Sequence, residues 1–254
     1  MSEKIYLWES EMPNLTKEKS EVKIEFDKES NVTKLVEVSN PLIQVFKPKE
    51  KINNGNAVLI CPGGSYQILA LDKEGTEPAV WLNKLGYTTY VLQYRVPDNR
   101  EGAFNDIQRA IKIIKNNYNH IKTGVLGFSA GGNLCARLST NFSNLSYNLI
   151  DEFDGGNCKP DFSLLIYPAY LDEGKSKSIS QNLLNDRNIC PTFIFGTEDD
   201  EHFNSAITFT NYLKSNFELQ TLAFGGHGYG LRKGNKAAEK WPILAKNWLK
   251  SITK

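Results

Sequence analysis

The stretch Gly127-Phe128-Ser129-Ala130-Gly131-Gly132 decides how the rest of the chain can be interpreted. The apolar pair Val125-Leu126 before it is typical of a short buried strand, and residues 133–138 after it are typical of a helix. A strand, the pattern G-x-S-x-G and a helix together predict a nucleophile elbow, a sharp turn that exposes one serine hydroxyl. The alternative is a glycine-rich turn with an idle serine, so the partners of Ser129 must decide.

Length and composition favour one globular domain. The chain has 254 residues, 40% of them apolar, and 30 basic side chains against 29 acidic ones. A single domain spanning residues 1–254 is therefore expected, with the polar residues 1–20 as an N-terminal arm. The net charge of +1 gives no indication of nucleic acid, an anionic membrane or a polyanionic substrate as partner.

The four cysteines and the N-terminus bear on location and cofactors. Cys61, Cys135 and Cys190 lie in or beside apolar stretches and are expected to be buried thiols, and no C-x-x-C pair suggests zinc. The chain has no apolar stretch long enough to span a membrane, and its first residues lack the apolar region of an export signal. We expect a cytoplasmic protein without metal or cofactor, although a signal removed from a precursor would leave the same sequence.

Buried strands alternate with helical segments along the chain. Residues 22–26, 32–38 and 42–46 are expected to pair antiparallel at one edge of a sheet, because their connections are too short for crossover helices. The other expected strands are 57–61, 88–93, 124–128, 162–167, 192–195 and 219–224, and the expected helices include 78–85, 104–114, 207–217 and a last one starting near Pro242. This order predicts an α/β fold with a mainly parallel sheet of about eight strands and helices on both faces. Thr76 is the expected N-cap of the helix at 78–85.

A serine nucleophile needs a base, and the chain has only three histidines. His227 stands among glycines just after the last strand, where a loop can carry its ring over the edge of the sheet. His120 precedes a strand and so lies at the opposite edge, and His202 is interpreted as a surface histidine. Ser129 and His227 both follow strands, and sites in parallel sheets form beyond the carboxyl ends of strands.

Two further segments follow strands in the same way. The turn at 196–201 contains four carboxylates, one of which could orient the base. The segment Pro62-Gly63-Gly64-Ser65-Tyr66 could supply backbone N–H groups to an oxyanion. We assign those donors to Ala130 and to Gly64 or Ser65, with a plain glycine turn as the alternative.

At these residues the chain resembles the α/β-hydrolase superfamily, and more narrowly the esterase/lipase group of bacterial acetylxylan-esterase-like and feruloyl-esterase-like proteins. The segments that carry the resemblance are Cys61–Tyr66, Tyr94-Arg95-Val96-Pro97, Gly127–Gly132, Phe195–Asp200 and Gly226–Gly230, which together span residues 61–230. Two departures stand out: the family's His-Gly-Gly-Gly is Pro62-Gly63-Gly64-Ser65 here, and Glu201-His202-Phe203 replaces its Val-Pro.

The resemblance implies a function and a choice of acid. The family's Gly-x-x-Asp turn maps its acid onto Asp199 rather than Asp200, which completes a triad of Ser129, Asp199 and His227. No large cap domain is expected, and an open site suits short acyl groups, acetyl above all, on a bulky, polar alcohol such as a sugar. Tyr66, Tyr170 and Tyr229 are candidate walls of the substrate site, with a core role as the alternative for each. A serine esterase is thus expected; a serine peptidase of the same fold and a non-catalytic binding protein are the alternatives.

Overall fold

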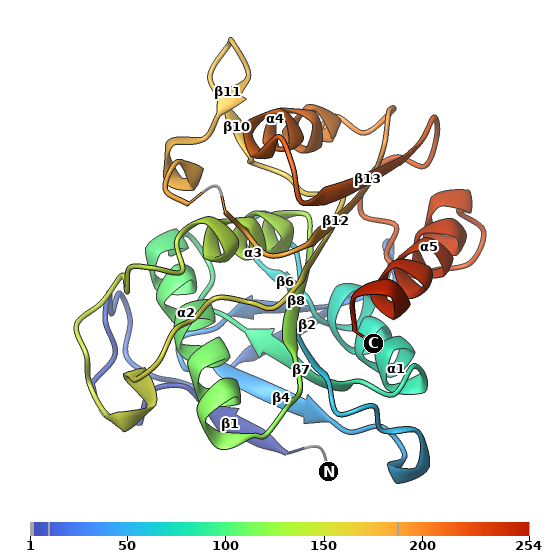
Figure 1. Ribbon diagram of the computed structural model, residues 1–254. Helices are drawn as coiled ribbons and strands as arrows, with labels where there is room; N and C mark the ends of the chain where they lie inside the picture. The colour runs from blue at the N-terminus through green and yellow to red at the C-terminus, as the bar shows by residue number, and fades with distance from the viewer. Residues whose placement is uncertain (1–2, 10, 187, 254) are drawn as a thin grey trace.

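An eight-stranded sheet forms the centre of the computed structural model, which describes residues 3–9, 11–186 and 188–253 (Figure 1). Six neighbouring strands run parallel, β4 lies antiparallel to β7, and β1 lies antiparallel to β4. In spatial order the strands are β1 (Lys4–Tyr6), β4 (Leu42–Phe46), β7 (Thr88–Gln93), β5 (Ala57–Cys61), β8 (Thr123–Phe128), β9 (Ser163–Ile166), β12 (Thr192–Thr197) and β13 (Phe217–Leu222). The predicted mainly parallel sheet of about eight strands is confirmed.

Helices cover both faces of this sheet, as the continuous apolar strands require. Every residue of β5, β7, β8, β9 and β12 is buried. One apolar core lies under α2 (Arg100–Asn117), α3 (Ala130–Thr140) and α4 (Phe203–Leu213). The other core lies under α1 (Glu77–Lys84) and α5 (Lys236–Ile252). The sheet is therefore rigid enough to hold loops at its edge in fixed positions.

The early strands differ from the prediction. Only β4 joins the main sheet; β2 (Lys23–Asp27), β3 (Val32–Glu37) and the short β6 (Leu69–Ala70) form a second antiparallel sheet. The described part of the N-terminal segment supplies the edge strand β1 and buries Leu7 and Trp8. The Trp8 indole N–H donates to Asp106 Oδ1 at 2.7 Å, so this segment is anchored on α2.

The predicted start of the last helix is wrong, and the helix predicted at 78–85 begins at Glu77 but lacks the expected cap. The last helix begins at Lys236, because the Asn235 side chain accepts hydrogen bonds from the N–H groups of Ala237 and Ala238, and Pro242 lies inside the helix. Thr76 makes no capping bond, since a π-helical turn, Asp72–Thr76, leads directly into α1. A π-helical turn is uncommon and often occurs near functional sites.

The remaining short elements lie in the polar segments between the strands. They are 3₁₀ turns at Glu50–Ile52, Glu152–Asp154 and Gln181–Leu183, and a small hairpin of β10 (Asp172–Glu173) and β11 (Ser178–Ile179). Within the described part of the chain, no helix combines the length and the apolar character needed to cross a bilayer.

Candidate active site

Ser129 occupies a strained turn between β8 and α3. Its φ is 51° and its ψ is −118°, a backbone conformation rare outside glycine. Its N–H donates to Ile166 O at 3.1 Å, and its carbonyl accepts the N–H of Asn133 at 3.1 Å. A Cβ at Gly127 or at Gly131 would collide with neighbouring backbone, which explains both glycines. The predicted nucleophile elbow is therefore present.

A hydrogen-bonded chain of three side chains runs from Ser129 through His227 to Asp200. The Ser129 hydroxyl lies 2.7 Å from His227 Nε2, and His227 Nδ1 lies 2.7 Å from Asp200 Oδ2. The Asp200 side chain is 1% exposed, and its other oxygen accepts the N–H of His202 at 2.8 Å. These three residues follow β8, β12 and β13, so the sheet brings them together from distant parts of the chain.

The structure contradicts the choice of Asp199 as the acid beside His227. The Asp199 carboxylate instead accepts the N–H groups of Gly226 at 2.9 Å and of Gly225 at 3.1 Å. Those N–H groups lower the pKa of the Asp199 carboxyl, Gly226 most of all. The turn after β12 points adjacent side chains in different directions: Asp200 goes inward to the ring, and Asp199 holds the loop that carries the ring.

The N–H groups predicted to stabilise an oxyanion belong to the segment after β5 and to the first residue of α3. Gly64 and Ser65 both have positive φ, 131° and 58°. Among the described residues, no hydrogen-bond partner is found for the N–H groups of Gly64, Ser65 and Ala130. Ala130 is the first residue of α3, where N–H groups lack intrahelical acceptors. The oxyanion role of these three N–H groups stays a prediction.

Two buried hydrogen bonds hold the loop that carries Gly64 and Ser65. The buried Tyr94 hydroxyl donates to Pro62 O at 2.7 Å, and the Gly63 N–H donates to the buried carboxylate of Glu74 at 2.8 Å. Tyr94 belongs to the segment Tyr94-Arg95-Val96-Pro97, and Arg95 forms a buried ion pair with Asp106. This segment therefore supports the site without reaching the reacting groups.

The predicted tyrosines separate into two groups. Tyr66 and Tyr170 lie side by side with ring centroids 6.5 Å apart, and the Arg100 guanidinium lies 4.9 Å from each ring. Asn133 joins them, because it accepts from the Tyr66 hydroxyl and donates to Tyr170 O. Tyr229 packs on Tyr167, 4.5 Å between centroids, on the opposite face of the sheet, and is 7% exposed. The substrate-binding role of all three stays a prediction.

His202 is not the surface residue that the sequence indicated. Its ring lies 4.9 Å from the His227 ring and 5.4 Å from Tyr170, and its side chain is 29% exposed. The sequence signal was only its position three residues after Asp199, which does not fix a side-chain direction. His120, by contrast, lies far from the triad, as expected, and bonds to the Tyr90 hydroxyl.

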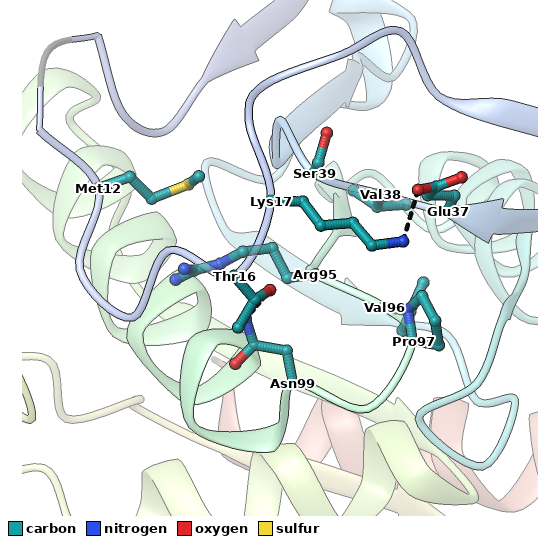
Figure 2. Close-up of a pocket in the computed structure, with 10 residues that line it drawn as sticks. All are labelled: Met12, Thr16, Lys17, Glu37, Val38, Ser39, Arg95, Val96, Pro97 and Asn99. Atoms are coloured by element: carbon teal, nitrogen blue, oxygen red, sulfur yellow. Dashed lines mark hydrogen bonds and ion pairs between the residues drawn. The ribbon is translucent and has the colours of Figure 1, made fainter.

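A separate pocket beside the N-terminal segment is unsuited to substrate. Its volume is about 20 Å³, close to the space of a single water molecule. Figure 2 shows its ten lining residues, among them Lys17 paired with Glu37. None of Ser129, Asp200 and His227 lines it. In the part of the chain that the structure describes, no group of three or more His, Cys, Asp or Glu side chains could hold a metal ion.

A mainly parallel sheet, a serine on the turn after β8 and a histidine after the last strand together define the α/β-hydrolase fold. Comparison with solved structures confirms this fold. The crystal structure of an acetyl ester-xyloside bifunctional hydrolase from Caldicellulosiruptor lactoaceticus matches with a TM-score of 0.75 and 25% identity, covering 98% of this chain and 96% of that one. Esterase 2 of Thermogutta terrifontis, phosphorylated by paraoxon, matches with a TM-score of 0.69 and 20% identity, covering 95% of each chain.

A sequence comparison is more specific. An acetylxylan esterase of Xylanibacter ruminicola is 27% identical over 233 residues, which cover 78% of this chain. The match covers only 46% of that esterase, so the chain spans about half the length of this relative. No family model matches the sequence. The resemblance to esterases of the α/β-hydrolase superfamily is thereby confirmed.

Proposed function

We propose that this protein is a serine carboxylic-ester hydrolase that removes short acyl groups, acetyl above all, from a carbohydrate or other small alcohol. The observation that carries the proposal is the 2.7 Å contact on each side of the His227 ring, to Ser129 and to Asp200. Similarity to an acetylxylan esterase and to an acetyl ester-xyloside hydrolase supports the choice of acyl group and of alcohol.

The geometry gives each side chain a role in an acyl-enzyme mechanism. Ser129 Oγ attacks the ester carbonyl while His227 Nε2 takes its proton, and the Asp200 carboxylate stabilises the imidazolium that forms. The N–H of Ala130 and those of Gly64 and Ser65 would bind the oxygen of the tetrahedral intermediate. His227 then donates the proton to the leaving alcohol. In the second half of the cycle, His227 takes a proton from the water that attacks the acyl enzyme and gives it to Ser129 Oγ as the carboxylic acid is released.

A fluorophosphonate probe tests the nucleophile directly. The wild-type protein should be labelled on Ser129, and the Ser129→Ala variant should not. The Thermogutta esterase phosphorylated by paraoxon supports this choice of reagent. A wild-type protein that stays unlabelled and does not cleave p-nitrophenyl acetate would instead be a binding protein with this fold.

Substrate panels separate the remaining possibilities. Cleavage of p-nitrophenyl acetate well ahead of octanoate, and deacetylation of acetylated xylo-oligosaccharides, would support the acetyl specificity. Faster cleavage of aminoacyl p-nitroanilides would identify a peptidase. The single-domain organisation and the cytoplasmic location remain predictions; four buried free thiols are in keeping with a reducing compartment.

A further inference from the structure

A buried carboxylate outside the triad contacts two of the segments that surround it. Glu74 belongs to the π-helical turn Asp72–Thr76, and it is 3% exposed. Its Oε2 accepts the Gly63 N–H at 2.8 Å, and its Oε1 accepts the Tyr167 hydroxyl at 2.9 Å. Because both oxygens act as acceptors, the arrangement fits an ionised carboxylate.

The first of these bonds fixes the loop that carries Gly64 and Ser65. Gly63 lies so close to the elbow that a Cβ there would be 2.8 Å from Ser129 Cβ and 2.6 Å from Glu74 Oε2. The Gly63 N–H is turned down to Glu74, which leaves the next two N–H groups free for an oxyanion. A loop with this bond broken could rotate all three N–H groups together.

The second bond leads to the loop that carries the histidine. The Tyr167 hydroxyl, which donates to Glu74, also accepts the Gly230 N–H at 3.0 Å. The Tyr167 ring meets the His227 ring edge-on with 5.0 Å between centroids. One buried carboxylate thus connects the segments after β5, β9 and β13.

We propose that Glu74 is a positioning residue that holds the oxyanion loop and the histidine loop in place, and whose negative charge favours the imidazolium form of His227 during catalysis. This inference rests on the proposed esterase function. Burial raises the pKa of the Glu74 carboxyl above its usual value, and the opposing effects of Lys73, Tyr167, Gly63 and His227 offset this only in part. The groups that face His227 and its loop are Asp200, His202, Ser129, Tyr167, Lys73, Asp199 and Glu74.

Substitutions of Glu74 can separate the effect of its charge from the effect of its side-chain length. Glu74→Gln keeps the shape and removes the charge, and its amide can accept only one of the two hydrogen bonds. Because a misplacement of about 1 Å can cost on the order of 10²-fold in rate, we expect kcat to fall by roughly that factor with little change in KM. Loss of the anion also destabilises the imidazolium, so the acidic limb of the kcat/KM profile should move to lower pH.

Two further variants keep the test decisive if Glu74→Gln folds poorly. Glu74→Asp retains the charge but is one methylene shorter, so kcat should fall while the acidic limb stays in place. Tyr167→Phe retains the Gly63 contact and the charge, so it should lower kcat less than Glu74→Gln without moving the limb. Asp154→Asn, which removes another buried carboxylate paired with Arg109, should lower stability and leave kcat and the pH profile unchanged.

The measurements are kcat and KM for p-nitrophenyl acetate across the pH range 5–9, with urea unfolding and circular dichroism to establish folding. A folded Glu74→Gln or Glu74→Asp variant with wild-type kcat would overturn the proposal, and so would an unmoved acidic limb in a folded Glu74→Gln. Failure of the proposed function itself looks different, because wild-type protein would then neither hydrolyse the ester nor react with a fluorophosphonate.

Discussion

Replacement of Asp200 by Asn should nearly abolish turnover. The carboxylate accepts the His227 Nδ1–H at 2.7 Å and the His202 N–H at 2.8 Å, so both oxygens are used. The amide of Asn offers one acceptor only and, with its NH₂ toward the ring, favours the wrong tautomer of His227. In a triad such a change lowers kcat by on the order of 10⁴-fold. At 1.36 kcal/mol for each factor of ten, that is about 5.4 kcal/mol of transition-state stabilisation.

Asp199→Asn is the matched control, because it makes the same change one residue earlier. The Asp199 carboxylate is exposed and accepts the N–H groups of Gly225 and Gly226. An Asn oxygen can keep one or both of these bonds, since Asn is also a good acceptor for backbone N–H groups. The histidine loop should therefore loosen slightly, and kcat should fall by about tenfold or less.

The assay is kcat for p-nitrophenyl acetate at pH 8, with the labelling rate of Ser129 by a fluorophosphonate as a second measurement. Both variants should unfold cooperatively, so a comparison of their urea midpoints separates lost catalysis from lost structure. The reasoning would be refuted by Asp199→Asn being the more damaging change, or by Asp200→Asn keeping a tenth or more of the wild-type kcat.

Three other predictions address stability and the oxyanion loop. Lys17 and Lys23 lower the pKa of Glu37 from 4.5 to about 2, so their stabilising interaction with Glu37 is present above pH 4.5 and lost as the pH falls toward 2. The stability that Glu37→Gln loses in urea unfolding should therefore shrink from pH 7 to pH 3, and a loss that stays constant would contradict this. Asn235→Ala should cost about 0.5–2 kcal/mol of unfolding free energy, because it removes the cap of α5, and an unchanged urea midpoint would contradict that role. Ser65→Gly should keep kcat close to wild type, since φ at this position is 58° and glycine adopts it freely; a loss near 10²-fold would show that the serine hydroxyl is itself needed.

The parts of the fold that the sequence predicts are those with strong local patterns. Continuous apolar runs identify β5 and β12, because strands buried on both faces leave no polar positions. The second sheet is not predictable in this way. Alternating residues predict β2 and β3 as strands, but β2 is almost wholly exposed and β6, which pairs with β3, is two residues long, so no pattern indicates that the three form a sheet of their own. Pairing between them is set by tertiary contacts.

The same limit applies to the site. G-x-S-x-G and the isolated His227 are predictable because the backbone turn and the scarcity of histidine restrict the choice. The acid is harder, because adjacent residues in a turn differ by a side-chain direction that no spacing reveals. Thr197 O accepts the Asp200 N–H at 3.1 Å, and that turn aims Asp200 rather than Asp199 inward. Glu74 gave no signal at all, since a buried glutamate in a π-helical turn looks like a surface residue in sequence.

The structure explains how Pro62-Gly63-Gly64-Ser65 can stand where the family resemblance implies His-Gly-Gly-Gly. The proposed oxyanion donors are backbone groups, so what the proposal requires is the path of the chain and not its side chains. Pro62 keeps that path because its carbonyl accepts the Tyr94 hydroxyl, and Gly63 keeps it through Glu74. Ser65 takes the left-handed backbone conformation that a glycine would take, at a modest cost in strain. Hydrogen bonds from Tyr94 and to Glu74 can thus hold the loop in place when its own sequence changes.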